Sequence, residues 1–239
     1  MGKIVGISGG DLRSTDVLNQ LAIEMTGKEK PKVLFIPTAS NDAKEYIQMI
    51  EKYYEAYGCE VQTLTLCKNS DTKEEVERYF EESDLIYVGG GDTKAMLEVW
   101  RQYGVDELLL KAYEKETVIT GISAGLIFWF RYGHSDSEFF KNPESWNYIF
   151  VEGLNKFPIA CCPHYNEEGR DSFDSMLKHK NCAGIALEND IAFVVDGQMM
   201  SIKKARHDAK AYWMEYKNGQ LLKREVVEGE RIDLELFRK

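Results

Sequence analysis

Short β-branched segments alternate with helical segments along the first half of this chain. The strand-like runs are residues 3–8, 33–36, 61–66, 85–88 and 117–120. Helical periodicity separates them over residues 15–25, 42–57 and 72–80, and two further helical patterns precede residue 117. A repeated strand–helix–strand order predicts a parallel sheet with helices on both faces and right-handed crossovers. We therefore expect an α/β fold.

The pattern changes after residue 130. Residues 131–150 are polar and aromatic without a clear period, which predicts a long irregular connection. Strands are expected at 157–162 and 184–187, with a helix over 167–179 between them. Two hairpins follow, 191–195 with 199–202 around Asp196-Gly197, and 212–216 with 221–226 around Asn218-Gly219. We expect one domain over residues 1–239, in which 191–239 form a hairpin-rich C-terminal extension.

The charge and composition argue against several classes of partner. The chain has 239 residues and a net charge of −10, and 44% of its residues are hydrophobic. Binding to duplex nucleic acid or to an anionic membrane surface needs a basic face, which an acidic chain disfavours. The sequence has no apolar stretch long enough to cross a bilayer. Residues 1–8 resemble a first strand rather than a signal peptide, so we expect a cytoplasmic protein.

The cysteines and histidines suggest neither a disulfide framework nor a metal site. The five cysteines form no C-x-x-C pair, and Cys161 and Cys162 are adjacent, where a disulfide would be strained. The four histidines show no ligand spacing with the cysteines. We expect free thiols in a reducing compartment, no metal and no cofactor.

The most informative motif is Gly-Ile-Ser-Ala-Gly at residues 121–125. It follows the strand-like run 117–120 and precedes residues 126–130, which can open a helix. A G-x-S-x-G nucleophile elbow requires this strand–turn–helix context, because the tight turn exposes the serine hydroxyl. The glycines remove Cβ atoms that would collide in the turn. The motif predicts Ser123 as a nucleophile, although small residues are also common where a strand simply meets a helix.

A serine hydroxyl needs a base within hydrogen-bond reach and a third group that orients the base. His164 follows the strand 157–162, so it would lie at the carboxyl edge of the sheet, where the elbow also lies. Glu188 follows the strand 184–187 in the same relation. The sequence therefore favours His164 as the base and Glu188 as the orienting carboxylate, with Asp190 and Asp136 as alternatives.

A triple glycine, Gly89-Gly90-Gly91, follows the strand 85–88 and precedes a helix. Such a loop can cradle a phosphate, but this one matches neither the Walker pattern nor G-x-G-x-x-G, which wants glycine where Ala95 and Met96 stand. We favour the other interpretation, in which a glycine amide of this loop and the amide of Ala124 form an oxyanion hole.

Taken in order, these elements resemble the dipeptidase E and cyanophycinase family of serine peptidases. The resemblance rests on an N-terminal strand with a glycine pair, the Gly-Gly-Gly-Asp loop, Gly-Ile-Ser-Ala-Gly, and strands ending in Pro-His-Tyr and Leu-Glu. It covers roughly the first two hundred residues. It implies a flavodoxin-like three-layer sandwich with a mainly parallel sheet, akin to class I glutamine amidotransferase domains, with serine in place of the amidotransferase cysteine.

The resemblance also implies roles for individual residues. Ser123 would be the nucleophile, His164 the general base and Glu188 its partner. The amides of Gly91 and Ala124 would form the oxyanion hole, and the reaction would need no cofactor or metal. The partner would be a small peptide substrate, and we expect the protein to be a monomer or a homodimer.

Members of this family differ in substrate preference. Dipeptidase E cleaves dipeptides with an N-terminal aspartate, and cyanophycinase cleaves β-linked aspartyl-arginine units. Both need a cation for a substrate carboxylate. Arg170, which follows His164, is our candidate for this cation, with Arg131 and Lys94 as alternatives, although the segment around it looks shorter than in dipeptidase E.

Two classes of function follow from these residues. The first is a serine peptidase that hydrolyses small peptides through an acyl-enzyme, with an aspartyl preference as one option and an amidase or esterase as a chemical variant. The second is a non-catalytic protein that binds an anionic metabolite at residues 89–93 and the elbow. An intact set of Ser123, His164 and Glu188 favours the enzyme.

Overall fold

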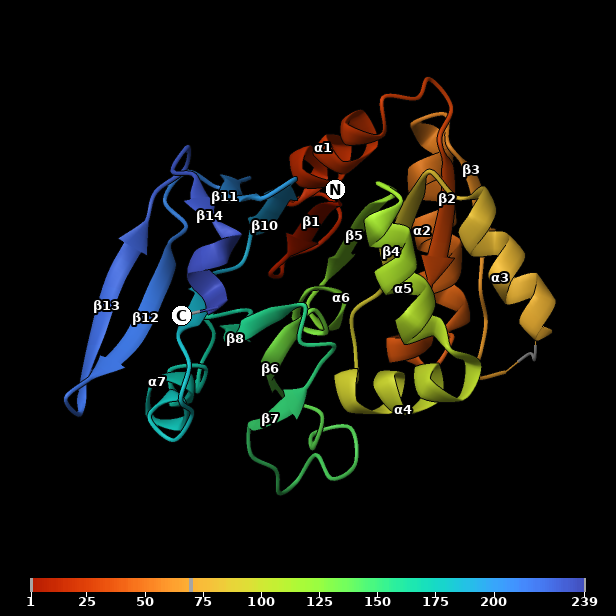
Figure 1. The fold of residues 1–239 in the computed structure, drawn as a ribbon. Helices are drawn as coiled ribbons and strands as arrows, with labels where there is room; N and C mark the ends of the chain where they lie inside the picture. The colour runs from red at the N-terminus through yellow and green to blue at the C-terminus, as the bar shows by residue number, and fades with distance from the viewer. Residues whose placement is uncertain (1, 69–70, 239) are drawn as a thin grey trace.

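The computed structural model describes residues 2–68 and 71–238 and has a mixed α/β fold (Figure 1). One sheet has eight strands in the order β14-β11-β10-β1-β5-β4-β2-β3. Its strands are β1 (Lys3–Ile7), β2 (Lys32–Ile36), β3 (Glu60–Thr63), β4 (Leu85–Val88), β5 (Val118–Ile122), β10 (Ile191–Asp196), β11 (Met199–Lys204) and β14 (Ile232–Asp233). The strands from β1 to β5 pair in parallel, whereas β10, β11 and β14 are joined by antiparallel pairing.

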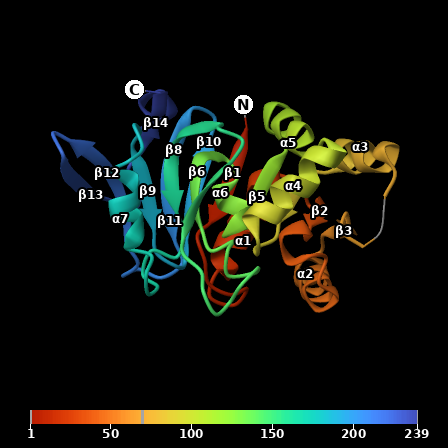
Figure 2. The same ribbon diagram turned by 90° about the horizontal axis from the view of Figure 1, so that it is seen from below.

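Helices cover both faces of this sheet. They are α1 (Asp16–Thr26), η1 (Thr38–Ser40), α2 (Lys44–Ala56), α3 (Lys73–Glu82), α4 (Thr93–Tyr103) and α5 (Val105–Glu114). Successive strand residues point to opposite faces, so Val5 and Phe35 pack with α1 and α2, while Ile4 and Leu34 pack in the core with α3, α4 and α5. Figure 2 shows α2 on one side of the strands and α3 and α5 on the other. These layers form the predicted three-layer sandwich.

A second sheet has six strands in the order β13-β12-β9-β8-β6-β7. Its strands are β6 (Phe130–Ser135), β7 (Ile149–Glu152), β8 (Phe157–Cys162), β9 (Gly184–Leu187), β12 (Ala211–Lys217) and β13 (Gln220–Val226). α7 (Ser172–Leu177) packs on one face of it through Phe173 and Leu177. The other face joins the main core, where the rings of Phe157 on β8 and Phe193 on β10 lie 5.2 Å apart.

The fold class expected from the sequence, α/β with mainly parallel strands and C-terminal antiparallel hairpins, is confirmed. The two hairpins form as predicted, but they join different sheets: β10 pairs with β1, and β12 pairs with β9. Strands from residues 191–238 therefore complete both sheets. No described helix is long and apolar enough to cross a membrane.

Three local expectations differ from the structure. Residues 131–150, predicted to be irregular, include most of β6 and the start of β7. β6 escaped detection because four of its six residues are buried, which leaves no alternation of polar and apolar residues. The helix predicted over 167–179 is confined to α7, and the helix after the elbow, α6 (Ala124–Ile127), is a single turn.

Candidate active site

Ser123 occupies the sharp turn between β5 and α6. Its backbone has φ 55° and ψ −104°, a conformation that L-residues rarely adopt. A Cβ atom on Gly121 or Gly125 would lie 2.6 Å or 2.2 Å from the carbonyl oxygen of Val88 on β4. The two glycines are thus required because the elbow packs directly on the backbone of the neighbouring strand. Strain of this kind is typically held in place by surrounding structure at functional sites.

The hydroxyl of Ser123 contacts the imidazole of His164. The distance from Ser123 Oγ to His164 Nε2 is 2.9 Å. β5 belongs to the eight-stranded sheet and β8 to the six-stranded sheet, so the site lies where the carboxyl ends of strands from two sheets meet. The side chain of His164 is 17% exposed, which leaves the pair accessible to a substrate.

Ser8, at the end of β1, links the two sheets beneath this pair. Its hydroxyl donates to the carbonyl oxygen of Leu187 at 2.7 Å and accepts from the backbone amide of His164 at 2.9 Å. His164 itself has φ 54°, so this amide contact helps to hold an unfavourable backbone conformation. A Cβ atom on the next residue, Gly9, would lie 2.2 Å from His164 Nδ1. The glycine after β1 is therefore needed for the histidine ring to fit.

The other ring nitrogen of His164 faces Asn189 and Glu167. Nδ1 lies 2.7 Å from Asn189 Oδ1 and 3.3 Å from Glu167 Oε1. Asn189 Nδ2 also donates to Glu167 Oε1 at 2.9 Å. These hydrogen bonds, first that from His164, lower the pKa of the Glu167 carboxyl to about 2. Neither residue was predicted from the sequence, although Glu167 is three residues after His164 and Asn189 directly follows Glu188.

The carboxylate of Glu188 contacts Lys210 and Arg206 and not His164. The backbone amide of Glu188 donates to Lys210 O at 3.0 Å and its Oε2 accepts from Lys210 N at 2.9 Å. Glu188 thereby extends the pairing of β9 with β12 by one residue, and its carboxylate accepts a hydrogen bond from the same partner residue, Lys210. The next residue, Asn189, lies in the turn after β9, and its side chain is the one that contacts His164. No described contact joins Glu188 to His164.

The two alternative carboxylates also have other partners. Asp190 Oδ1 accepts from Ser14 Oγ at 2.6 Å, and its Oδ2 lies 3.3 Å from Arg206 Nε. Asp136 Oδ2 lies 3.2 Å from Arg170 Nη2. In the described part of the chain, the carboxylate nearest to His164 is that of Glu167.

Arg170, the predicted cation for a substrate carboxylate, is 2% exposed. Besides Asp136, its guanidinium donates to the carbonyl oxygen of His134 at 3.2 Å and stacks over the ring of Tyr148 at 4.6 Å. Of the alternatives, Lys94 is an exposed residue at the start of α4, and Arg131 lies over the ring of Tyr132 at 5.2 Å. The structure therefore gives Arg170 internal partners for its charge.

The glycine loop after β4 lies beside the elbow. A Cβ atom on Gly90 would be 3.6 Å from the Cβ of Ser123. Gly91 has φ 137°, and its own Cβ would collide with the carbonyl oxygen of Ala39 at 2.2 Å, so only glycine fits there. Ala124 is the first residue of α6. Within the described residues, the amides of Gly91 and Ala124 have no acceptor, which suits them to bind a developing anion.

A second pair of reactive residue types, Cys162 and His134, is buried nearby. Cys162 Sγ lies 3.5 Å from His134 Nδ1, and His134 Nε2 lies 3.0 Å from Ser172 Oγ. Burial raises the pKa of the Cys162 thiol well above its usual value. Burial, aided by the charge of Arg170, lowers the pKa of His134 to about 3. Both groups stay neutral, so this pair lacks the thiolate of a nucleophilic cysteine.

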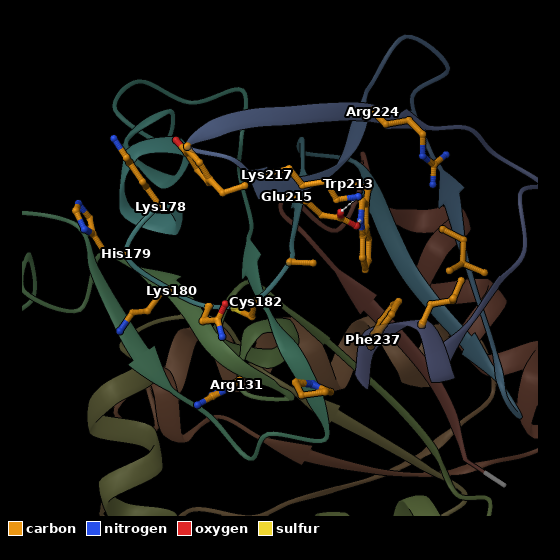
Figure 3. A pocket seen from close by; sticks show the side chains of 17 residues that line it. Arg131, Lys178, His179, Lys180, Cys182, Trp213, Glu215, Lys217, Arg224 and Phe237 are labelled. Atoms are coloured by element: carbon orange, nitrogen blue, oxygen red, sulfur yellow. Dashed lines mark hydrogen bonds and ion pairs between the residues drawn. The ribbon is translucent and has the colours of Figure 1, made fainter. Parts of the chain in front are cut away.

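A large cavity of about 1080 Å³ lies elsewhere, between the β12–β13 hairpin, residues 178–183 before β9 and the C-terminal η2 (Leu234–Arg238). Figure 3 shows basic and aromatic side chains around it, among them Arg131, Lys180 and Trp213. Neither Ser123 nor His164 lines it. The geometry of the serine and histidine, rather than the size of a cavity, therefore locates the candidate site.

All five cysteines are free. Among the described residues, no group of three or more histidine, cysteine, aspartate or glutamate side chains is arranged to hold a metal ion.

Sequence comparison assigns the chain to a family. Residues 4–203 match Peptidase family S51, which covers most of the 239 residues. The chain belongs to peptidase family S51. This S51 peptidase is therefore a hydrolase of the serine peptidase class, and the resemblance to dipeptidase E found in its motifs is confirmed.

The S51 peptidase has relatives of similar length. It is 31% identical over 219 residues to the uncharacterized peptidase YgaJ of Bacillus subtilis (strain 168), covering 89% of this chain and 91% of YgaJ. It is 29% identical over 136 residues to the uncharacterized peptidase Lmo0363 of Listeria monocytogenes, covering 56% of this chain and 65% of that protein.

Two solved structures share the fold. A peptidase from an acI-B1 actinobacterium superposes with a TM-score of 0.75 at 19% identity, covering 98% of this chain and 97% of the other. A putative peptidase E protein from Listeria monocytogenes EGD-e gives a TM-score of 0.65 at 21% identity, covering 85% of this chain and 98% of the other.

Proposed function

We propose that this S51 peptidase hydrolyses short peptides through an acyl-enzyme on Ser123. The observation that carries the proposal is the 2.9 Å contact between Ser123 Oγ and His164 Nε2 at a strained strand–helix elbow. Such a contact lets a neutral imidazole take the hydroxyl proton while the oxygen attacks a carbonyl carbon. An accessible serine with a base at this distance is the arrangement that acyl transfer requires.

In the first half of the reaction, His164 Nε2 accepts the proton of Ser123 as Oγ bonds to the scissile carbonyl carbon. The carbonyl oxygen becomes an oxyanion, which the amides of Gly91 and Ala124 are available to bind. The protonated His164 then gives its proton to the leaving amine, and the C–N bond breaks. A water molecule, deprotonated by the same nitrogen, releases the second product and restores the hydroxyl of Ser123.

Two residues, Asn189 and Glu167, share the role of orienting the His164 ring and stabilising its charged form at Nδ1. Asn189 Oδ1 accepts the proton of Nδ1, which fixes the tautomer that leaves Nε2 free to act as a base. Asn189 is neutral, so the negative charge that stabilises the imidazolium comes from Glu167, 3.3 Å from Nδ1. The contacts of Glu188 with Lys210 support a structural role for Glu188 in place of the catalytic role expected from the sequence.

The core that joins the two sheets supports a single peptidase domain over residues 1–239. The unpaired cysteines suit a reducing compartment such as the cytoplasm. We propose a small peptide as the partner of the site, with no metal or cofactor in the reaction.

A serine-directed fluorophosphonate probe tests the proposed function. The purified protein should become labelled at Ser123, and Ser123→Ala should abolish the labelling while the melting temperature is maintained. Peptide hydrolysis should disappear in the same variant. Labelling at another residue, or hydrolysis that survives Ser123→Ala, would show that the reaction uses a different nucleophile. Absence of both labelling and hydrolysis in the parent protein would favour the non-catalytic binding protein.

A further inference from the structure

The large cavity beside the β12–β13 hairpin has a basic lining, although the chain as a whole is acidic, with a net charge of −10. Among the described residues that line it, one is a glutamate, Glu215, and five are lysine or arginine: Arg131, Lys178, Lys180, Lys217 and Arg224. Its volume of about 1080 Å³ is close to the upper end of the roughly 300–1,000 Å³ that sites for small molecules enclose. The cavity therefore has the size of a ligand site and the charge to hold an anion.

This cavity lies at the end of the second sheet opposite to His164. β6, β8 and β9 run parallel to one another. Arg131 and Pro158 are the second residues of β6 and β8, and residues 178–183 directly precede β9, so the cavity is lined at the amino ends of these strands. His164 follows the carboxyl end of β8. A ligand in the cavity would therefore occupy a site separate from the candidate active site.

Two of the five cations already have carboxylate partners. Lys217 Nζ lies 2.8 Å from Glu215 Oε2. Arg224 Nη1 lies 2.8 Å and 2.9 Å from the two carboxylate oxygens of Glu230. The charges of Lys217 and Arg224 are thus balanced within the protein.

The other three cations, Arg131, Lys178 and Lys180, form no ion pair within residues 2–68 and 71–238. Two of them converge on one ring, because Lys180 Nζ and Arg131 Cζ lie 4.2 Å and 5.2 Å from the centroid of Tyr132. Burial raises the pKa of the Cys182 thiol, which also lines the cavity, and the charges of Lys180 and Arg131 oppose this rise. Like charges held together in this way attract an anion.

Neighbouring carboxylates do not cancel this positive charge. Glu152 on β7 is the cross-strand partner of Tyr132, and Glu235 precedes the lining residue Leu236 in η2. Neither of these two glutamates lines the cavity, and neither forms an ion pair within the part of the chain that the structure describes. The lining therefore keeps three uncompensated cations.

The remaining part of the lining is aromatic and apolar. The rings of Trp213 and Phe237 pack at 5.2 Å, and Leu236 beside them is 48% exposed. In the view of Figure 3, Arg131 and Lys180 lie on the left of the cavity, and Trp213 and Phe237 lie on the right. A cavity with a cationic side and an aromatic side suits a ligand that has anionic groups at one end and a planar apolar group at the other.

We propose that this cavity binds a phosphorylated small molecule with an aromatic group, of the size of a nucleotide. A diphosphate ester carries about three negative charges near neutral pH, which matches the three uncompensated cations. The aromatic group would pack beside Trp213 and Phe237. Because the cavity is separate from Ser123, this inference does not depend on the proposed function.

Isothermal titration calorimetry with ADP, in buffer without divalent cations, tests the inference. The parent protein should bind ADP. It should bind inorganic pyrophosphate, which lacks the aromatic group, and adenosine, which lacks the charge, more weakly by about tenfold or more. The double substitution of Arg131→Gln with Lys180→Gln should weaken ADP binding by about tenfold to a hundredfold, the range for losing hydrogen bonds to a charged group.

The double substitution of Lys44→Gln with Arg101→Gln is the matched control. It removes the same number of positive charges from exposed positions on α2 and α4, outside the lining. It should bind ADP as the parent does, and melting temperatures should show that both double variants are folded. Absence of ADP binding to the parent, or an equal loss in both double variants, would overturn the inference. Adenosine or pyrophosphate binding as tight as ADP binding would also overturn it.

Discussion

Ser123 Oγ lies 2.9 Å from His164 Nε2, although the two residues follow strands of different sheets. β1 makes this meeting possible, because Ser8 at its end donates to Leu187 and accepts from the amide of His164. The contact therefore depends on how the two sheets are joined. From the sequence, both residues are expected at the carboxyl edge of one sheet.

Removing either member of this pair should abolish hydrolysis. Ser123→Ala and His164→Ala should each lower kcat by about a millionfold, and the double variant should be little worse, because the two residues act as a unit. Steady-state kinetics on a peptide substrate measure all three. Losses that add up in the double variant would mean that His164 does not activate Ser123.

Glu167→Gln should lower kcat by about a hundredfold, because the imidazolium loses the carboxylate nearest to it. Asn189→Ala should also lower kcat, since Nδ1 of His164 loses its hydrogen-bond acceptor. Glu188→Gln should keep a rate close to that of the parent, because its partner is the amide of Lys210. The opposite order of Glu167 and Glu188 variants would restore Glu188 as the orienting acid.

Gly9→Ala should damage catalysis more than stability. The added Cβ would lie 2.0 Å from Asn189 Oδ1 and 2.2 Å from His164 Nδ1, so the ring must move. A displacement of about 1 Å costs on the order of a hundredfold in rate. Gly219→Ala is the contrasting control: its Cβ would meet nothing within 4 Å, but Gly219 has φ 79°, so this variant should lose stability and keep its rate. Full activity of Gly9→Ala would show that the ring can shift without loss.

The folded protein should lose stability as the pH falls from about 6.5 toward 3, in part through His134. Burial lowers its pKa from 6.5 to about 3, so the unfolded chain binds this proton first in that range. The stabilisation is fully present above pH 6.5. Chemical denaturation at several pH values should give a shallower decline for His134→Gln, which cannot take the proton. An unchanged slope would mean that other groups dominate the acid response.

Local patterns in the sequence were enough to predict much of the fold and the two residues that meet at the candidate site. The strands and helices up to β5 follow from short apolar runs and helical periodicity, which depend on neighbours in the chain. Asp196-Gly197 and Asn218-Gly219 predicted both hairpins because their turn geometry is local as well. Ser123 and His164 could be selected because each follows a strand that the pattern reveals.

The tertiary structure alone decided which strands share a sheet and which side chain reaches His164. The pairing of β6, β8 and β9 in a second sheet depends on partners distant in sequence. Glu188 and Asn189 are adjacent and both polar, and the tertiary structure gives Glu188 the amide of Lys210 as its partner and Asn189 the ring of His164. Arg170 likewise looks like a free cation in the sequence, but long-range packing against Asp136 and Tyr148 buries its charge. A sequence pattern depends on neighbouring residues and so predicts local structure. The partner of a side chain depends on segments that are distant in the sequence and are brought close only by the fold.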